Sequence, residues 1–100
     1  MEARLDLHGM TQQEAHGALI RFITGSHLAS RQVVLVITGK GRGGEGAGIL
    51  RRAVPHWLAG RELSPIVASY GPAHQSHGGA GALYVRLRSP KRAGKGRPRP

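Results

Sequence analysis

The sequence has no cysteine, few aromatic residues and no long apolar run, and each shortage excludes a class of protein. Without cysteine there is neither a disulfide framework nor a thiolate metal site. No stretch approaches the roughly 18 consecutive apolar residues of a membrane span, and no charged-then-apolar secretory leader opens the chain. We therefore expect a cytoplasmic protein without a membrane partner.

Aromatic side chains are limited to Phe22, Trp57, Tyr70 and Tyr84, so Val, Ile, Leu and Ala must build the core. Aromatic residues do not alternate with basic ones as they do in a base-stacking platform for single strands. Low sequence specificity is therefore expected of any nucleic-acid binding.

Carboxylates are also scarce, and this bears on metal chemistry. The chain has five acidic residues, whereas a two-metal nuclease site usually gathers several carboxylates in one place. Glu14 suits a helix cap and Glu62 a helix end, which leaves few candidates. We expect no two-metal site, so that the alternatives are one Mg²⁺ near Asp6 or acid–base chemistry without a metal.

Basic residues, in contrast, are abundant. Fifteen Lys and Arg against five Asp and Glu give a net charge of +10. Such a balance predicts a polyanionic partner, because phosphate contacts release condensed counterions. Residues 89–100 combine basic residues with Pro and Gly and are predicted to be a disordered tail. Residues 1–88 still hold ten basic and five acidic residues, so the predicted domain is itself basic, although a merely solvated basic surface is the alternative.

The periodicity of apolar residues predicts an α/β domain. Apolar and polar residues alternate over residues 5–9, as in a strand with one buried face. Residues 33–38 form a continuous apolar run rich in β-branched residues, and behind the capping-box sequence that opens at Thr11 apolar residues recur at helical spacing. Gly25 is the expected end of the first helix, and Pro55 is expected to kink or restart the second. Strands are predicted over residues 5–9, 33–38, 66–70 and 83–88, and helices over 12–25 and 49–58.

Three short motifs occur in order along this pattern. Leu5-Asp6-Leu7-His8-Gly9 forms the first strand, Thr38-Gly39-Lys40-Gly41 follows the second strand, and Gly78-Gly79-Ala80-Gly81 precedes the last. With these motifs in register, residues 4–88 resemble the small MutS-related (Smr) domain family. The resemblance implies a βαβαββ two-layer α/β sandwich with a mixed four-stranded sheet and two helices.

The resemblance also implies nucleic-acid binding and, as in some members, nuclease activity on DNA or RNA. By analogy Asp6 and His8 are catalytic, and Lys40 and its neighbouring glycines meet the phosphates. Some relatives carry His where this chain has Thr38, which bears on rate or substrate choice.

The residues themselves support a site at the end of the first strand. Asp6 and His8 lie two apart, so their side chains are expected on one face of a strand. A carboxylate can fix the tautomer of an imidazole, as a general base requires. A structural hydrogen-bonded pair at a strand end is the alternative interpretation.

The glycine-rich segment that begins at Gly39 follows a strand predicted to be buried, and ligands of open α/β sheets bind beyond such strand ends. It lacks the Walker spacing, so ATP is not expected. If the first two strands are parallel neighbours, His8 and Lys40 open onto one crevice, with glycine amides and Lys40 contacting a phosphate; a flexible connector is the alternative. The predicted nucleic-acid or phosphate contacts are Thr38, Gly39, Gly41, Arg42, His77, Gly78, Gly79, Gly81 and Arg86.

Two functions follow from these residues. The first is an endonuclease that nicks DNA or RNA with low sequence specificity, using Asp6, His8 and Lys40. RNA offers its own 2′-hydroxyl as the attacking group, so a His base with Lys electrostatics suffices there. The second is a binding module without chemistry that holds branched DNA, or RNA on ribosomes.

Overall fold

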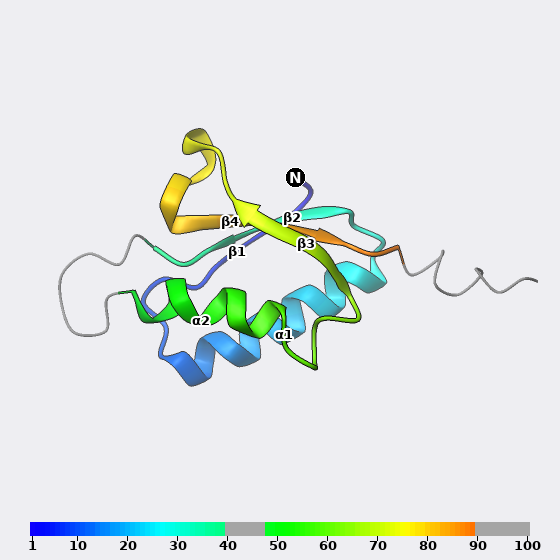
Figure 1. The fold of residues 1–100 in the computed structure, drawn as a ribbon, viewed down its shortest axis with the longest axis horizontal. Helices are drawn as coiled ribbons and strands as arrows, with labels where there is room; N and C mark the ends of the chain where they lie inside the picture. The colour runs from blue at the N-terminus through cyan, green and yellow to red at the C-terminus, as the bar shows by residue number, and fades with distance from the viewer. Residues whose placement is uncertain (40–47, 90–100) are drawn as a thin grey trace, which may run out of the picture.

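The computed structural model describes residues 1–39 and 48–89, which form a two-layer α/β sandwich (Figure 1). A four-stranded sheet is one layer, and two helices covering one of its faces are the other. The fold class predicted from the sequence is confirmed. In chain order the elements are β1 (Arg4–Asp6), α1 (Gln12–Leu28), β2 (Val33–Ile37), α2 (Ile49–Leu58), β3 (Val67–Pro72), the 3₁₀ turns η1 (Gln75–His77) and η2 (Gly79–Gly81), and β4 (Ala82–Leu87).

The strands are arranged in the order β1-β2-β4-β3. β1 and β2 are parallel neighbours, as predicted, and α1 is the crossover between them. β4 runs antiparallel to both β2 and β3. The C-terminal ends of β1 and β2 therefore lie side by side, next to the start of β4.

Alternation along the strands divides the sheet into a covered face and an open face. Val34 and Val36 of β2 point toward the helices and are fully buried with Val85 of β4. Leu35 and Tyr84 belong to a second, smaller apolar cluster on the opposite face. The main core consists of Leu7, Ala15, Leu19, Ile23, Val34, Val36, Leu50, Val54, Leu58, Leu63, Val67, Val85 and Leu87.

The first helix begins as its sequence predicts. The Thr11 hydroxyl accepts a hydrogen bond from the Glu14 amide at 3.1 Å, and the Glu14 carboxylate accepts one from the Thr11 amide at 3.0 Å. The predicted end at Gly25 is wrong, because the helix continues to Leu28. The Gly25 carbonyl still accepts from the Ala29 amide, and Ser30 takes the positive φ of 63° beyond the helix end.

The second helix covers the predicted residues 49–58. It runs continuously through Pro55, so the predicted restart is not observed. None of the described helices is long and apolar enough to cross a membrane. Strand limits differ from the predicted ones by at most three residues, and two 3₁₀ turns lie between β3 and β4.

Replacing Thr11 by Ala is expected to destabilise the domain by about 1 kcal/mol, since the helix loses its side-chain cap. For a domain of this size such a loss lowers Tm by about 4–8 °C. Thr24→Ala, at an exposed position within α1, is the matched control and should raise Tm slightly, because alanine is the better helix former. Equal Tm shifts of both variants by thermal circular dichroism would contradict the role of the cap.

Candidate active site

Asp6 and His8 meet at the C-terminal end of β1. Asp6 is the last residue of the strand, and its backbone partner in β2 is Ile37. Leu7 is fully buried, and its amide donates to the Ile37 carbonyl at 2.8 Å. This anchored leucine leaves the side chains on either side of it exposed, as the sequence predicts.

Asp6 binds His8 through one carboxylate oxygen. Oδ1 lies 2.7 Å from the His8 ring Nδ1 and accepts the His8 backbone amide at 3.0 Å. An ionised carboxylate can only accept, so Nδ1 carries a proton and Nε2 of the neutral ring holds a lone pair. The His8 side chain is 69% exposed, so a substrate can reach Nε2.

The pKa of Asp6 reflects opposing influences. Burial raises it, but the hydrogen bonds from the His8 ring and amide and the charges of His8 and Arg4 together lower the pKa below its usual value. The carboxylate therefore stays ionised at neutral pH. It can stabilise an imidazolium while His8 holds a transferred proton.

The three sequence motifs converge beside this pair. The Gly81 carbonyl accepts from the Thr38 amide at 2.8 Å and from the Gly39 amide at 3.1 Å. Gly39 has a φ of +88°, and a Cβ there would lie 3.3 Å from the His8 Cβ. The end of β2 thus packs directly against His8, as predicted for two parallel neighbouring strands whose C-terminal ends lie side by side.

The same contacts change the roles expected of Thr38 and of the glycines. Thr38 is buried, and its hydroxyl donates to the carbonyls of Gly39 and Gly81 at 3.2 and 3.3 Å. The expectation that the Gly39 amide faces a phosphate does not match this geometry, because the amide already donates to Gly81. The amides of Gly78, Gly79 and Gly81 likewise donate to protein carbonyls within the 3₁₀ turns. These residues shape the site and present no free backbone donor.

The remaining predicted contacts divide into two groups. His77 and Arg86 belong to the open face of the sheet: the His77 ring is hydrogen-bonded to Tyr84, and Arg86 is exposed on β4. Lys40, Gly41 and Arg42 lie outside the described residues, as does the predicted tail from residue 90 onward.

Among residues 1–39 and 48–89, no three His, Asp or Glu side chains gather as a metal-binding group. A single Mg²⁺ near Asp6 remains a prediction.

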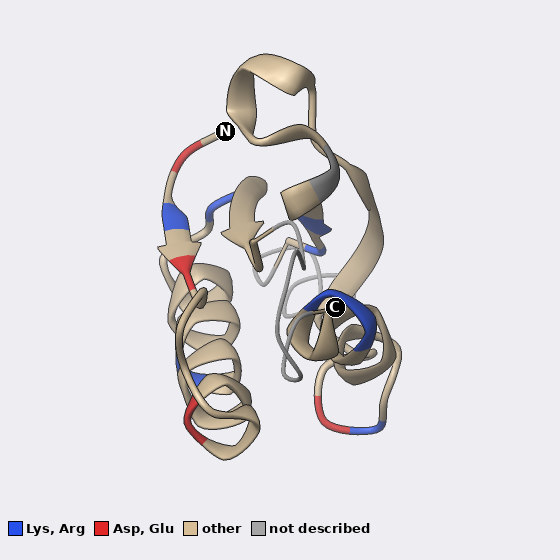
Figure 2. Cartoon of the chain, turned by 90° about the vertical axis from the view of Figure 1, so that its left-hand side faces the viewer, with Lys and Arg blue, Asp and Glu red and all other residues tan. Residues whose placement is uncertain are grey.

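Two further residues, to which the sequence pattern assigned no role, lie on the same sheet face as this pair. Arg4 precedes Asp6 by two residues on the same strand face, and its charge lowers the Asp6 pKa. Tyr84 precedes Arg86 in the same way on β4. Strand alternation alone indicates both. The acidic end of β1 and the basic start of α2 are visible at one end of the molecule (Figure 2).

Comparisons with known proteins agree on one family. Residues 5–88 match the family described as Smr domain. The structure resembles the Smr domain of Thermus thermophilus MutS2, with a TM-score of 0.72 and 26% identity over 86% of this chain and 98% of that one. It also resembles YdaL, a stand-alone small MutS-related protein from Escherichia coli, with a TM-score of 0.78 and 34% identity over 86% of this chain and 64% of that one.

Relatives with an assigned role carry a further indication. The chain is 36% identical over 88 residues to a protein of Photobacterium profundum named ribosome rescue factor SmrB, covering 88% of this chain and 46% of that protein. A Vibrio cholerae protein of the same name is 37% identical over 91 residues, which cover 88% of this chain and 43% of that protein. This chain therefore spans less than half the length of these relatives.

The Asp6–His8 hydrogen bond can be measured through the Asp6 pKa. We expect NMR titration to find the Asp6 midpoint below its usual value, and His8→Ala to raise it partway, because the backbone amide bond remains. His56→Ala, which replaces an exposed histidine on α2, should leave the midpoint unchanged.

The lowered pKa of Asp6 also predicts how the stability of the fold depends on pH. Because the folded pKa of Asp6 lies below the unfolded one, the ionised pair stabilises the fold above the unfolded pKa. The contribution is lost as the pH falls through the folded pKa. His8→Ala should therefore reduce the acid sensitivity of unfolding, and an unaltered Asp6 midpoint in that variant would contradict the bond.

Gly39→Ala tests the close approach of β2 to His8. A side chain at positive φ costs about 1–2 kcal/mol, and the new Cβ meets the His8 Cβ. Unfolding in denaturant should register this loss, and the amide NMR signal of His8 should move. Gly25→Ala is the control, because a Cβ there meets nothing within 4 Å and replacement within a helix should stabilise by about 0.5–1 kcal/mol. Stabilisation by both replacements would argue against the packing.

Proposed function

The chain belongs to the Smr domain family, and we propose that it binds nucleic acid and cleaves phosphodiester bonds with the Asp6–His8 pair. The observation that supports cleavage is the 2.7 Å contact between Asp6 Oδ1 and His8 Nδ1, which leaves Nε2 of an exposed ring available. The net charge of +10 supports a polyanionic substrate. Asp6 is the orienting group and His8 the general base.

RNA suits this pair better than DNA as a substrate, because it brings its own nucleophile. His8 Nε2 takes the proton of a 2′-hydroxyl, and the 2′-oxygen attacks the adjacent phosphorus. The bond from phosphorus to the 5′-oxygen breaks, and that oxygen takes a proton from water. The products are a 2′,3′-cyclic phosphate and a 5′-hydroxyl end. Cleavage of DNA would instead need a water molecule activated at the same position.

Cations can stabilise the charge on the reacting phosphate, since the Gly39 amide is already hydrogen-bonded within the protein. Arg4 projects from β1 on the same side as Asp6 and is exposed. Lys40 follows Gly39 in the chain, and its proposed phosphate contact rests on the sequence alone. Both supply the electrostatic stabilisation that the engaged amide of Gly39 does not.

A second function is binding without chemistry. Relatives named ribosome rescue factor support RNA on ribosomes as the target, and a cytoplasmic location is proposed with it. The two functions share the same surface and differ in whether His8 transfers a proton. A cleavage assay separates them.

Purified protein should nick labelled RNA, with and without Mg²⁺ or chelator, and supercoiled plasmid should serve as the DNA arm. A general base contributes about 100- to 10,000-fold to rate, so His8→Ala and Asp6→Asn should lose that much. Lys40→Ala and Arg4→Gln should lower the rate through phosphate contact. Loss in the chelator arm alone would show that cleavage requires Mg²⁺.

The control variant is His56→Ala, which alters an exposed histidine on α2 and should cleave normally. The 5′-hydroxyl product distinguishes attack by the 2′-oxygen from attack by water. Cleavage undiminished in both His8→Ala and Asp6→Asn would contradict the catalytic assignment. Binding without any cleavage in the parent protein would favour the binding module.

A further inference from the structure

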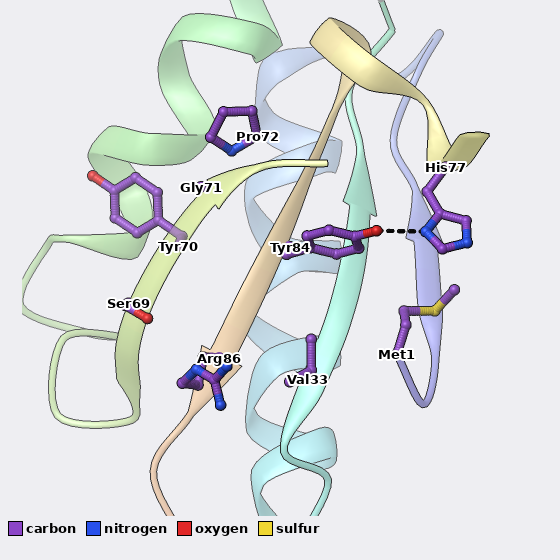
Figure 3. A pocket seen from close by; sticks show the side chains of 9 residues that line it. All are labelled: Met1, Val33, Ser69, Tyr70, Gly71, Pro72, His77, Tyr84 and Arg86. Atoms are coloured by element: carbon purple, nitrogen blue, oxygen red, sulfur yellow. Dashed lines mark hydrogen bonds between the residues drawn. The ribbon is translucent and has the colours of Figure 1, made fainter. Parts of the chain in front are cut away.

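A pocket of about 420 Å³ lies on the open face of the sheet, away from the helices (Figure 3). Its size is within the range of about 300–1,000 Å³ typical of small-molecule sites. Its lining combines aromatic and cationic side chains, with backbone from the edge strand β3. The principal side chains are those of His77, Tyr84 and Arg86. The Tyr70 ring points away from them at the edge of the sheet (Figure 3).

Tyr84 is the central ring of this pocket and is held in place. Its hydroxyl is 2.5 Å from His77 Nδ1, and the two rings meet edge to face with centroids 5.8 Å apart. The Tyr84 side chain extends from β4 toward His77, which comes from η1 above the open face (Figure 3). Its attachment to a packed strand and to a second ring limits the entropy that it can lose on binding.

The space beside Tyr84 exists because its neighbour across the sheet is a glycine. Gly71 of β3 pairs with Tyr84, and a Cβ at Gly71 would meet nothing within 4 Å. Arg86, two residues along β4 from Tyr84, pairs with Ser69 and is exposed. The Tyr84 ring therefore has an open position beside it on β3 and a guanidinium two residues along β4.

The pocket shares a face with the Asp6–His8 pair. Arg4 pairs with Leu35, and Leu35 pairs with Tyr84, so the three form one row across the sheet. Two strand spacings put the Cα atoms of Arg4 and Tyr84 about 10 Å apart, and Asp6 lies about 12 Å from Tyr84. A short stretch of extended strand covers such a distance.

We propose that this pocket binds an unpaired nucleobase of the strand whose phosphate lies at Asp6 and His8. The base stacks on the Tyr84 ring, and Arg86 contacts the backbone of the same strand. A paired base stays stacked between its neighbours and cannot enter. The inference rests on the proposed function and adds that the substrate is single-stranded near the cut.

Binding can be measured on the full chain carrying His8→Ala, which keeps the oligonucleotide intact. The probe is a short RNA oligomer containing 2-aminopurine, whose fluorescence falls when it stacks on an aromatic ring. The same RNA in a duplex, and DNA of the same sequence in both forms, complete the set. We expect tighter binding and stronger quenching with the single strands than with either duplex.

Gly71→Val fills the pocket without altering Asp6 or His8, and Tyr84→Leu removes the ring. Base–aromatic stacking predicts that each weakens single-strand binding about 5- to 100-fold and removes the quenching. Tyr84→Phe keeps the ring and should retain the quenching. Arg21→Gln, which removes an exposed cation from α1, is the control for charge, and circular dichroism establishes that each variant folds.

If Gly71→Val and Tyr84→Leu both leave affinity and quenching as they are in the chain with His8→Ala alone, the pocket proposal is overturned. Equal binding of single strands and duplexes would overturn it as well. Neither result affects cleavage by Asp6 and His8, which is measured separately. If the parent protein binds single strands through the pocket but cleaves nothing, the pocket stands and the catalytic proposal fails.

Discussion

The carbonyl of Gly81 is the acceptor on which the arrangement of this site depends. By accepting the amides of Thr38 and Gly39, it joins the turn before β4 to the end of β2. Gly39 then lies against His8, whose ring and amide are bound by Asp6. Three segments far apart in sequence are thereby held at one edge of the sheet. Gly39 and Gly81 thus serve close packing at this site.

A two-layer fold of this size has one large surface that the helices do not cover. The main core occupies the space between helices and sheet, so the opposite face keeps only the small cluster around Leu35. Side chains on alternate positions of β1 and β4 are free to differ there without loss of core packing. Arg4 and Arg86 occupy such positions, whereas Tyr84 also packs against the small cluster. The fold therefore separates the residues that stabilise it from those that can meet a ligand.

The sequence predicts this fold well because its signals are local and agree with one another. The capping box at Thr11, the β-branched run of β2 and the strand alternation in β4 each indicate their element directly. The predicted helix end at Gly25 is wrong because backbone hydrogen bonds continue as far as the Ala29 amide, and they outweigh the low helix propensity of glycine. Two other features depend on non-local pairing. They are the hydrogen bond from the Gly39 amide to the Gly81 carbonyl and the placement of Tyr84 opposite Gly71. Composition and spacing carry neither, so the aromatic pocket is absent from the sequence-based expectations.

Register along the short strand β1 decides whether these groups share a face at all. A slip by one residue would turn Asp6 and Arg4 toward the core and Leu5 toward solvent. Glu2 opposes such a slip at the start of the strand, because its carboxylate accepts the amides of Gln32 and Val33 while its own amide donates to the Val33 carbonyl. The bonds from Val33 and Gln32 also lower the Glu2 pKa. The buried Leu7 fixes the other end through Ile37. A strand of three residues can thus position an acid–imidazole pair because both of its ends are pinned to β2.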